Sequence, residues 1–170
     1  VDDTVDVVKA AIDIVNGASF DNNLPCIAEK ECFAFNTIAD KLIDAMTKNG
    51  AYLISGAQID KLLSFALINK NGKYVINKDW VGRDASKFLK ELGIDADPRL
   101  IICEVEENHP FVQTEMMMPV LPIVRVNDID EAIEMAVKAE HGCRHSAHIH
   151  SKNVDRLPRF ARAVETTIFV

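Results

Sequence analysis

The runs Leu100-Ile101-Ile102-Cys103-Glu104-Val105 and Val120-Leu121-Pro122-Ile123-Val124-Arg125-Val126 decide the fold of this chain. Both are nearly continuous in apolar residues, which is typical of strands that are covered on both faces. Strands of this kind occur mainly in parallel sheets, because the helices that connect parallel strands pack on the two faces of the sheet. The two runs therefore predict neighbouring buried strands.

The residues that follow the second run continue as an alternation of helices and strands. Asn127 or Asp128 can cap a helix, and five apolar residues at helical spacing come next: Ile129, Ala132, Ile133, Ala136 and Val137. Residues 145–150 then predict a strand and residues 155–164 a further helix. This alternation favours an α/β fold with a mostly parallel sheet and helices on both of its faces.

The first hundred residues add elements of the same kinds. A helix is predicted from a cap at Asp3 or Thr4 to Gly17, with Val5, Val8, Ala11, Ile12 and Val15 on its buried face. Short strands are predicted over 31–35 and 51–54, and helices over 36–49, 55–68 and 84–92, with a turn at 69–72. No repeat or long linker interrupts the chain, so we expect one α/β domain over residues 1–170.

The composition is that of an ordinary globular domain, with 48% hydrophobic and 26% charged residues among 170. The net charge of -7 and the scattered basic residues argue against nucleic acid or an anionic membrane as a partner. No apolar run approaches the ~20 residues that a membrane span needs. Four cysteines in a chain of this size are more simply explained as free thiols in a reducing cytoplasm than as disulfides.

Both ends of the sequence have patterns typical of helices and strands inside a domain. The chain enters its first helical pattern within a few residues of Val1, and it closes on Thr166-Thr167-Ile168-Phe169-Val170, which predicts a buried strand. We therefore expect this sequence to be a fragment of a longer polypeptide.

The candidate for chemistry is Cys26, within Ser19-Phe20-Asp21-Asn22-Asn23-Leu24-Pro25-Cys26-Ile27-Ala28-Glu29-Lys30-Glu31. The Asp, Asn and Pro residues favour a turn directly ahead of the strand predicted at 31–35. A thiol in such a loop can meet a substrate, and Lys30 or backbone amides could stabilise its thiolate. A cysteine taken alone is more often a small buried apolar residue, so both interpretations stay open at this point.

The other cysteines and the histidines give weaker signals. Cys32 and Cys103 lie in predicted strands, where core packing is the expected role, and Cys143 is ambiguous. Five histidines are present, of which His148 and His150 would share one face of the strand predicted at 145–150. No Cys-x-x-Cys or His-Glu-x-x-His pattern occurs, so we expect no metal site.

A second candidate is Glu115, which precedes the Met run of Glu115-Met116-Met117-Met118-Pro119-Val120. A carboxylate beside the end of a strand is well placed to bond the hydroxyl groups of a sugar, although the residues alone favour a plain solvated loop acid. Neither G-x-G-x-x-G nor a Walker pattern occurs. The sequence therefore shows no nucleotide-binding domain of its own.

Three segments, in order and at fitting separations, resemble the aldehyde dehydrogenase superfamily. Asn22-Asn23-Leu24-Pro25-Cys26 is similar to the loop of its catalytic cysteine, and residues 115–120 are similar to its Glu-x-Phe-Gly-Pro-Val motif. His141-Gly142 and the strand predicted after it resemble the continuation of that motif. Residues 19–31 and 149–153 most resemble the CoA-acylating branch of ethanolamine and propanediol utilisation. Met117 and Met118 depart from the motif, where the superfamily has Phe and Gly.

The resemblance implies a catalytic-domain fragment over residues 1–170, with the cofactor-binding domain outside this chain. It implies that Cys26 is the catalytic nucleophile, that Glu115 binds the nicotinamide ribose, and that the oxyanion Asn and any general base lie upstream. NAD is the implied cofactor, coenzyme A the co-substrate, and acetaldehyde or propionaldehyde the substrate, with no metal. The full-length protein is expected to be a homo-oligomer in the cytoplasm or in the lumen of a bacterial microcompartment.

Two other functions stay open. A hydrolytic aldehyde dehydrogenase would differ only in the acyl acceptor, which would be water in place of coenzyme A. A non-catalytic α/β interaction domain would keep the fold but not the chemistry, and its Cys26 would react no differently from the other thiols.

Overall fold

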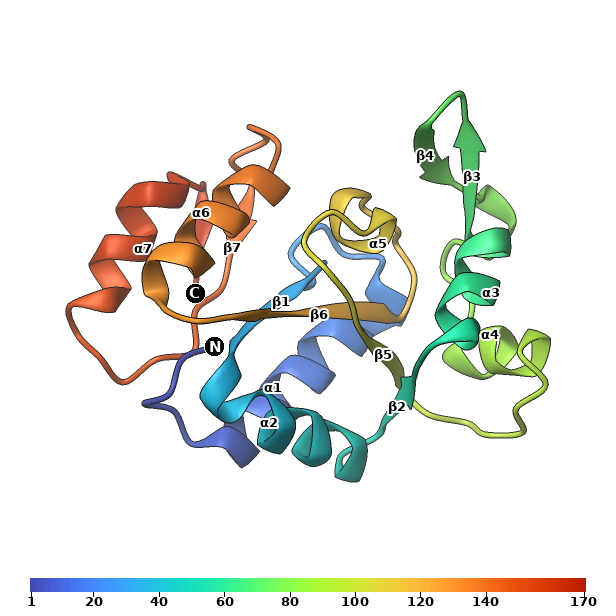
Figure 1. The fold of residues 1–170 in the computed structure, drawn as a ribbon, viewed down its shortest axis with the longest axis horizontal. Coiled ribbons are helices and arrows are strands. Elements are labelled where there is room, and N and C mark those ends of the chain that lie inside the picture. The colour runs from blue at the N-terminus through green and yellow to red at the C-terminus, as the bar shows by residue number, and fades with distance from the viewer.

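The computed structural model describes all residues from 1 to 170, and its centre is a four-stranded sheet (Figure 1). The strands are β1 (Cys32–Phe35), β6 (Val120–Val126), β5 (Leu100–Glu104) and β2 (Ala51–Ile54), in the spatial order β1-β6-β5-β2. All three pairings are parallel, and Ile101 stands opposite Val120 in the β5–β6 pair. The two apolar runs are therefore adjacent central strands, which confirms the prediction from their composition.

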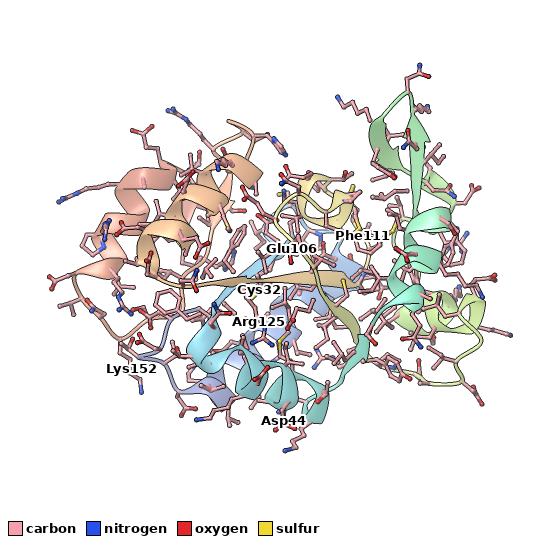
Figure 2. All side chains as sticks on the ribbon, viewed as in Figure 1. Cys32, Asp44, Glu106, Phe111, Arg125 and Lys152 are labelled. Atoms are coloured by element: carbon pink, nitrogen blue, oxygen red, sulfur yellow. The ribbon has the colours of Figure 1, made fainter.

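One face of this sheet is covered by helices α1 (Val7–Ser19) and α2 (Asn36–Lys48), which lie side by side (Figure 1). Their apolar residues form one core cluster with side chains from all four strands of the sheet. Cys32 belongs to this cluster and lies within the layer of side chains in Figure 2, whereas Asp44 and Lys152 lie at the periphery.

The opposite face is covered by a second group of helices: α3 (Ala57–Ala66), α4 (Ala85–Glu91), α5 (Pro110–Gln113) and α6 (Ile129–Ala139). A core cluster joins α3 and α4 to β2 and β5 and contains Phe88, Cys103, Phe111 and Met118. A smaller one, of Val112, Val124 and Ala139, joins α5 and α6 to β6. Helix α7 (Arg156–Val164) packs on α6 (Figure 1). The predicted α/β class with helices on both faces is confirmed.

The first helix differs from the prediction at both ends. Its cap is Asp6, whose carboxylate accepts from the Lys9 amide, so Val5 precedes the helix, and Val8 and Ile12 are exposed. The helix also runs through Gly17 to Ser19. Gly17 is needed there for space, because a Cβ atom at this position would come within 2.9 Å of the carboxyl carbon of Glu29.

The helix predicted over 55–68 is too long, because residues 67–76 form a β-hairpin. Strands β3 (Leu67–Lys70) and β4 (Lys73–Ile76) pair antiparallel around Asn71 and Gly72, whose φ angles are 56° and 87°. Asn-Gly is the preferred pair for the two left-handed positions of such a tight turn. A short 3-10 helix, η2 (Lys78–Trp80), follows the hairpin.

The strand predicted over 145–150 is reduced to β7 (Ser146–Ala147), which lies outside the central sheet. It pairs in parallel with β8 (Ile168–Phe169), and residues 167–170 are exposed, so the buried strand predicted there is wrong. The cause is composition: polar residues alternate through 145–150, whereas a fully covered central strand needs an almost continuous apolar run. None of the helices is both long and apolar enough to cross a bilayer.

Candidate active site

The segment that leads to Cys26 leaves α1 through the 3-10 helix η1 (Phe20–Asn23). Asp21, Asn22 and Asn23 all have left-handed backbones, with φ of 47°, 53° and 63°. Asp and Asn tolerate this region better than other residues with a Cβ atom, which explains why the sequence uses them here. The Asn23 side chain donates to the carbonyls of Ala18 (2.8 Å) and Glu29 (3.0 Å), so it ties the two ends of the loop together.

Cys26 itself lies in the middle of a tight turn. The Ala28 amide donates to the Pro25 carbonyl at 3.0 Å, which places Cys26 and Ile27 at the two central positions. Both residues are exposed. The structure therefore presents the Cys26 thiol at the surface on a hydrogen-bonded turn, as the loop composition predicts.

This turn forms one wall of a cleft of about 420 Å³. Glu115, in the segment ahead of β6, lines the same cleft. The other walls are the C-terminal end of α6 and residues 141–148. The structure thus brings Cys26 and Glu115 to one site, although their chemical roles stay predictions. The side chain of Glu115 is exposed and has no hydrogen bond or ion pair within the chain, which suits a carboxylate that binds hydroxyl groups of a ligand.

Lys30 and Glu31 form the charged floor of the cleft. The Lys30 ammonium donates to the carbonyls of Val112 (3.0 Å) and Ala139 (2.8 Å) and lies 3.3 Å from a Glu31 carboxylate oxygen. Lys30 is thus engaged by two carbonyls and a carboxylate, so the idea that it stabilises the Cys26 thiolate gains no support. Burial raises the pKa of Glu31 to about 7, Lys30 opposes this, and the charge of Glu115 raises the pKa further.

Two more side chains of the cleft, Glu29 and His148, face each other. The distance from His148 Nδ1 to Glu29 Oε1 is 4.0 Å, and His148 Nε2 lies 3.0 Å from the Ile27 carbonyl oxygen. Burial raises the pKa of Glu29, and the His148 charge opposes this. Sequence reasoning missed Glu29, Glu31 and His148 as site residues. The one sequence signal for them was the pair of acidic residues, Glu29 and Glu31, in a segment that leads into a buried strand.

The remaining cysteines divide into two classes. Cys32 and Cys103 are buried, and burial raises the pKa of Cys32 to about 11 and that of Cys103 to about 12. Both thiols therefore stay protonated at neutral pH, and their expected role in the core is confirmed. Cys143 is exposed and lines the same cleft as Cys26.

None of the histidines belongs to a cluster of three or more side chains that could hold a metal ion. His109 caps α5, where its Nδ1 accepts from the Phe111 amide at 3.2 Å, and burial lowers the pKa of His109. His141 Nε2 lies 3.2 Å from the Gln113 carbonyl oxygen. His148 and His150 both lie beyond the two-residue strand β7.

The model of the aldehyde dehydrogenase family matches residues 1–170, and the chain therefore belongs to that family. Among curated relatives, it is 45% identical over 174 residues to the acetaldehyde dehydrogenase (acetylating) EutE of Salmonella typhimurium, with 100% of this chain and 37% of the relative covered. It is 46% identical over 173 residues to the propanal dehydrogenase (CoA-propanoylating) of the same organism, with 100% of this chain and 36% of the relative covered. The chain thus spans little more than a third of the length of these relatives.

Solved structures agree with these similarities. A propionaldehyde dehydrogenase from the fucose utilisation bacterial microcompartment of Clostridium phytofermentans superposes with a TM-score of 0.94 at 49% identity, over 99% of this chain and 39% of that chain. A propionaldehyde dehydrogenase of Rhodopseudomonas palustris, solved with bound CoA and an acylated cysteine, has a TM-score of 0.94 at 46% identity. The match covers 99% of this chain and 38% of that chain. A solved acylating relative therefore carries its acyl group on a cysteine.

Proposed function

We propose that the protein to which this chain belongs oxidises a small aldehyde, acetaldehyde or propionaldehyde, to its acyl-CoA with reduction of NAD. The observation that carries the proposal is the exposed Cys26 thiol on a cleft that Glu115 also lines. The acylated cysteine and bound CoA of the Rhodopseudomonas palustris relative support the same chemistry. Residues 1–170 are assigned to the catalytic domain because they carry Cys26, and coverage of about a third of the relatives leaves room for a cofactor-binding domain elsewhere in the protein.

In the proposed reaction, the Cys26 thiolate attacks the aldehyde carbonyl and forms a thiohemiacetal. The backbone amide of Cys26 donates to the developing oxyanion, since a hydrogen-bond donor fixed in advance stabilises negative charge where it develops. NAD, when bound, supplies the hydride acceptor that converts the thiohemiacetal into a thioacyl enzyme. The thiol of coenzyme A then takes the acyl group and releases Cys26. A covalent intermediate of this kind divides one difficult step into two easier ones.

Glu115 has a binding role in this proposal. Its carboxylate is exposed on the wall of the cleft and is not engaged by the rest of the chain, so it can accept hydrogen bonds from the ribose hydroxyls of the cofactor. Met117 has a left-handed backbone, with φ of 54°, and Met118 is fully buried. The two residues that depart from the family motif therefore shape the backbone and the core behind Glu115, and Met118 does not face the cleft.

The location and assembly of the protein belong to the same proposal. We infer an enzyme that assembles as a homo-oligomer in the cytoplasm or in the lumen of a bacterial microcompartment, without a metal ion. The source of the Clostridium phytofermentans relative supports the compartment. Sedimentation of the full-length protein, and its co-purification with compartment shells, test these inferences.

The test of the proposed activity is NADH formation by the full-length protein with acetaldehyde or propionaldehyde, with and without coenzyme A. Strong dependence on coenzyme A is the expected result. Turnover without it would replace the acylating enzyme by a hydrolytic one, and no turnover in either condition would favour a non-catalytic α/β domain. Cys26→Ala should abolish acyl transfer and leave the fold intact, so retained turnover in that variant would remove Cys26 as the nucleophile.

A further inference from the structure

Two side chains from one short segment hold consecutive carbonyls of the Cys26 turn. The Ser146 hydroxyl donates to the Cys26 carbonyl at 3.4 Å, and the His148 imidazole lies 3.0 Å from the Ile27 carbonyl oxygen. Ser146 and His148 are two residues apart along an extended segment, so their side chains point to the same side. The two contacts therefore form one clamp on the peptide groups that follow Cys26.

The geometry of the turn shows why such a clamp has an effect. Tight turns of types I and II differ mainly in the orientation of the central peptide, which here carries the Cys26 carbonyl. Neither Cys26 nor Ile27 has a positive φ, so the turn is not of type II. Ser146 bonds the central carbonyl, and β-branched Ile27 disfavours the positive φ that a flip would require. The clamp thus selects one orientation of the backbone that carries the thiol.

The imidazole of His148 is itself held in a defined state. A carbonyl oxygen can only accept a hydrogen bond, so Nε2 of His148 carries the proton that Ile27 receives. Nδ1 faces the Glu29 carboxyl group at 4.0 Å. The imidazole thus lies between Glu29 and the turn, with one ring nitrogen towards each.

Glu29 is itself held in place by contacts with Gly17 and Asn23. Its Oε2 atom is buried without a hydrogen-bond partner, and its carboxyl group rests on Gly17 of α1. Its carbonyl accepts from the Asn23 side chain at 3.0 Å. A carboxyl oxygen that is buried without a hydrogen-bond partner is costly, so Glu29 is held beside His148 at some expense of stability.

We propose that His148, supported by Glu29 and Ser146, is a positioning residue that fixes the Cys26 turn for nucleophilic attack. This inference rests on the proposed function, because it assumes that Cys26 forms the thiohemiacetal. His148 does not act as the base for the thiol, since its Nε2 proton is committed to Ile27 and its Nδ1 atom faces Glu29. Its effect is to keep the thiol and the Cys26 amide in one orientation relative to the substrate.

The test compares His148→Ala, which removes the donor, with His148→Gln, which keeps an N–H group at a similar reach, in the full-length protein. Two quantities are measured: amide hydrogen exchange of residues 26–29, and kcat and KM for NADH formation. Loss of one such hydrogen bond should accelerate exchange and lower kcat by about tenfold in His148→Ala. KM for NAD should stay within about twofold if Glu115 is untouched. His148→Gln should recover most of both effects.

Thr47→Ala is the matched control, because it also removes a side-chain donor to a backbone carbonyl, but on α2 at the far face of the sheet. It should change neither quantity. Unchanged exchange at residues 26–29 in His148→Ala would overturn the clamp, and faster exchange with unchanged kcat would overturn its role in positioning. Should His148→Ala fail to fold, Ser146→Ala takes its place, with an expected acceleration of about threefold. No change in that variant would also overturn the inference.

The two arms separate this inference from the function on which it rests. An inactive wild-type protein, with either aldehyde and either acyl acceptor, would overturn the proposed function and with it a positioning role for His148. The exchange measurement would still report whether the clamp exists. If the wild type is active and His148→Ala changes neither the amide exchange of residues 26–29 nor kcat, only the positioning role of His148 is overturned.

Discussion

The charge of Glu115 raises the pKa of Glu31, although the two carboxylates come from segments far apart in the sequence. Glu31 leads into β1, Glu115 precedes β6, and these strands are neighbours in the central sheet. Both carboxylates line the cleft that Cys26 borders. The strand order therefore places two acids together at the candidate site, and the less exposed of them, Glu31, has a pKa of about 7.

Glu31 should make the protein less stable as the pH rises from about 4.5 to 7. Its pKa in the folded protein is about 7, above its ordinary value of 4.5, so the folded state binds more protons in this window. The free energy of unfolding then falls as Glu31 ionises, by at most about 3 kcal/mol. Glu31→Gln should remove this part of the pH dependence and raise stability at pH 8. Urea unfolding at several pH values measures how the free energy of unfolding changes with pH.

An exposed acid from the neighbouring loop, Glu106, provides the control for that measurement. Glu106→Gln should leave the slope of stability against pH unchanged. The same slope in Glu31→Gln as in the wild type would show that the ionisation of Glu31 does not act on folding.

Thiol labelling should separate the four cysteines into two pairs. Cys26 and Cys143 are exposed, whereas Cys32 and Cys103 are buried with pKa values raised to about 11 and 12. Because the thiolate is the reactive species, a native protein at pH 7.5 should incorporate iodoacetamide only at Cys26 and Cys143. Peptide mass spectrometry reads the sites. Labelling of Cys103 at the rate of Cys26 would contradict this packing.

Glu115→Ala should weaken cofactor binding and leave the nucleophile intact. If Glu115 bonds the ribose, its loss removes two charge-assisted hydrogen bonds, so KM for NAD should rise by about tenfold or more. Labelling of Cys26 should not change. A Glu115→Ala variant with an unaltered KM for NAD would exclude the ribose role.

Gly17→Ala tests the packing of the loop on α1. Alanine in place of glycine inside a helix normally stabilises it by up to about 1 kcal/mol. Here the new methyl group would meet the Glu29 carboxylate, so we expect destabilisation by about 1–3 kcal/mol. In a Glu29→Ala background, where the space is free, Gly17→Ala should instead stabilise the protein. Thermal unfolding of the four variants of this cycle measures both effects, and destabilisation by Gly17→Ala in both backgrounds would contradict the contact.

The central strands and the turn that carries Cys26 could be predicted from sequence because their signals are local. The apolar runs at 100–105 and 120–126 require cover on both faces, and the Asn and Pro residues around Cys26 require a turn. The hairpin at 67–76 was missed even though Asn71-Gly72 is a strong hairpin signal, because the residues before it also fit a helical pattern.

The side chains around Cys26 could not be predicted in the same way. His148 meets the Ile27 carbonyl across more than a hundred residues, and the strand order that brings Glu115 towards Glu31 is a tertiary property. Nothing in the pattern near Glu29 shows that Gly17 leaves space for its carboxylate. The candidate residues Cys26 and Glu115 could thus be named from sequence, whereas the electrostatics of the cleft depend on packing.

Asp2 is buried and ties the start of the chain to Ser151 and to Arg156 at the start of α7. Burial alone would raise the pKa of Asp2, but hydrogen bonds from Ser151, Thr4 and Arg156 outweigh it and lower the pKa to about 2. A lowered pKa stabilises the folded state above about pH 4, and this contribution of about 2 kcal/mol is lost as the pH falls towards 2.

Arg156→Ala should remove much of that contribution, because the guanidinium donates to Asp2 at 2.8 Å. The variant should be less stable at pH 7 by about 1–3 kcal/mol and should show a shallower loss of stability between pH 4 and 2. Arg162→Ala, on an exposed position of the same helix, is the control and should behave like the wild type. Acid titrations of unfolding by circular dichroism compare the three proteins. Equal slopes for Arg156→Ala and the wild type would mean that Thr4 and Ser151 alone hold the Asp2 carboxylate.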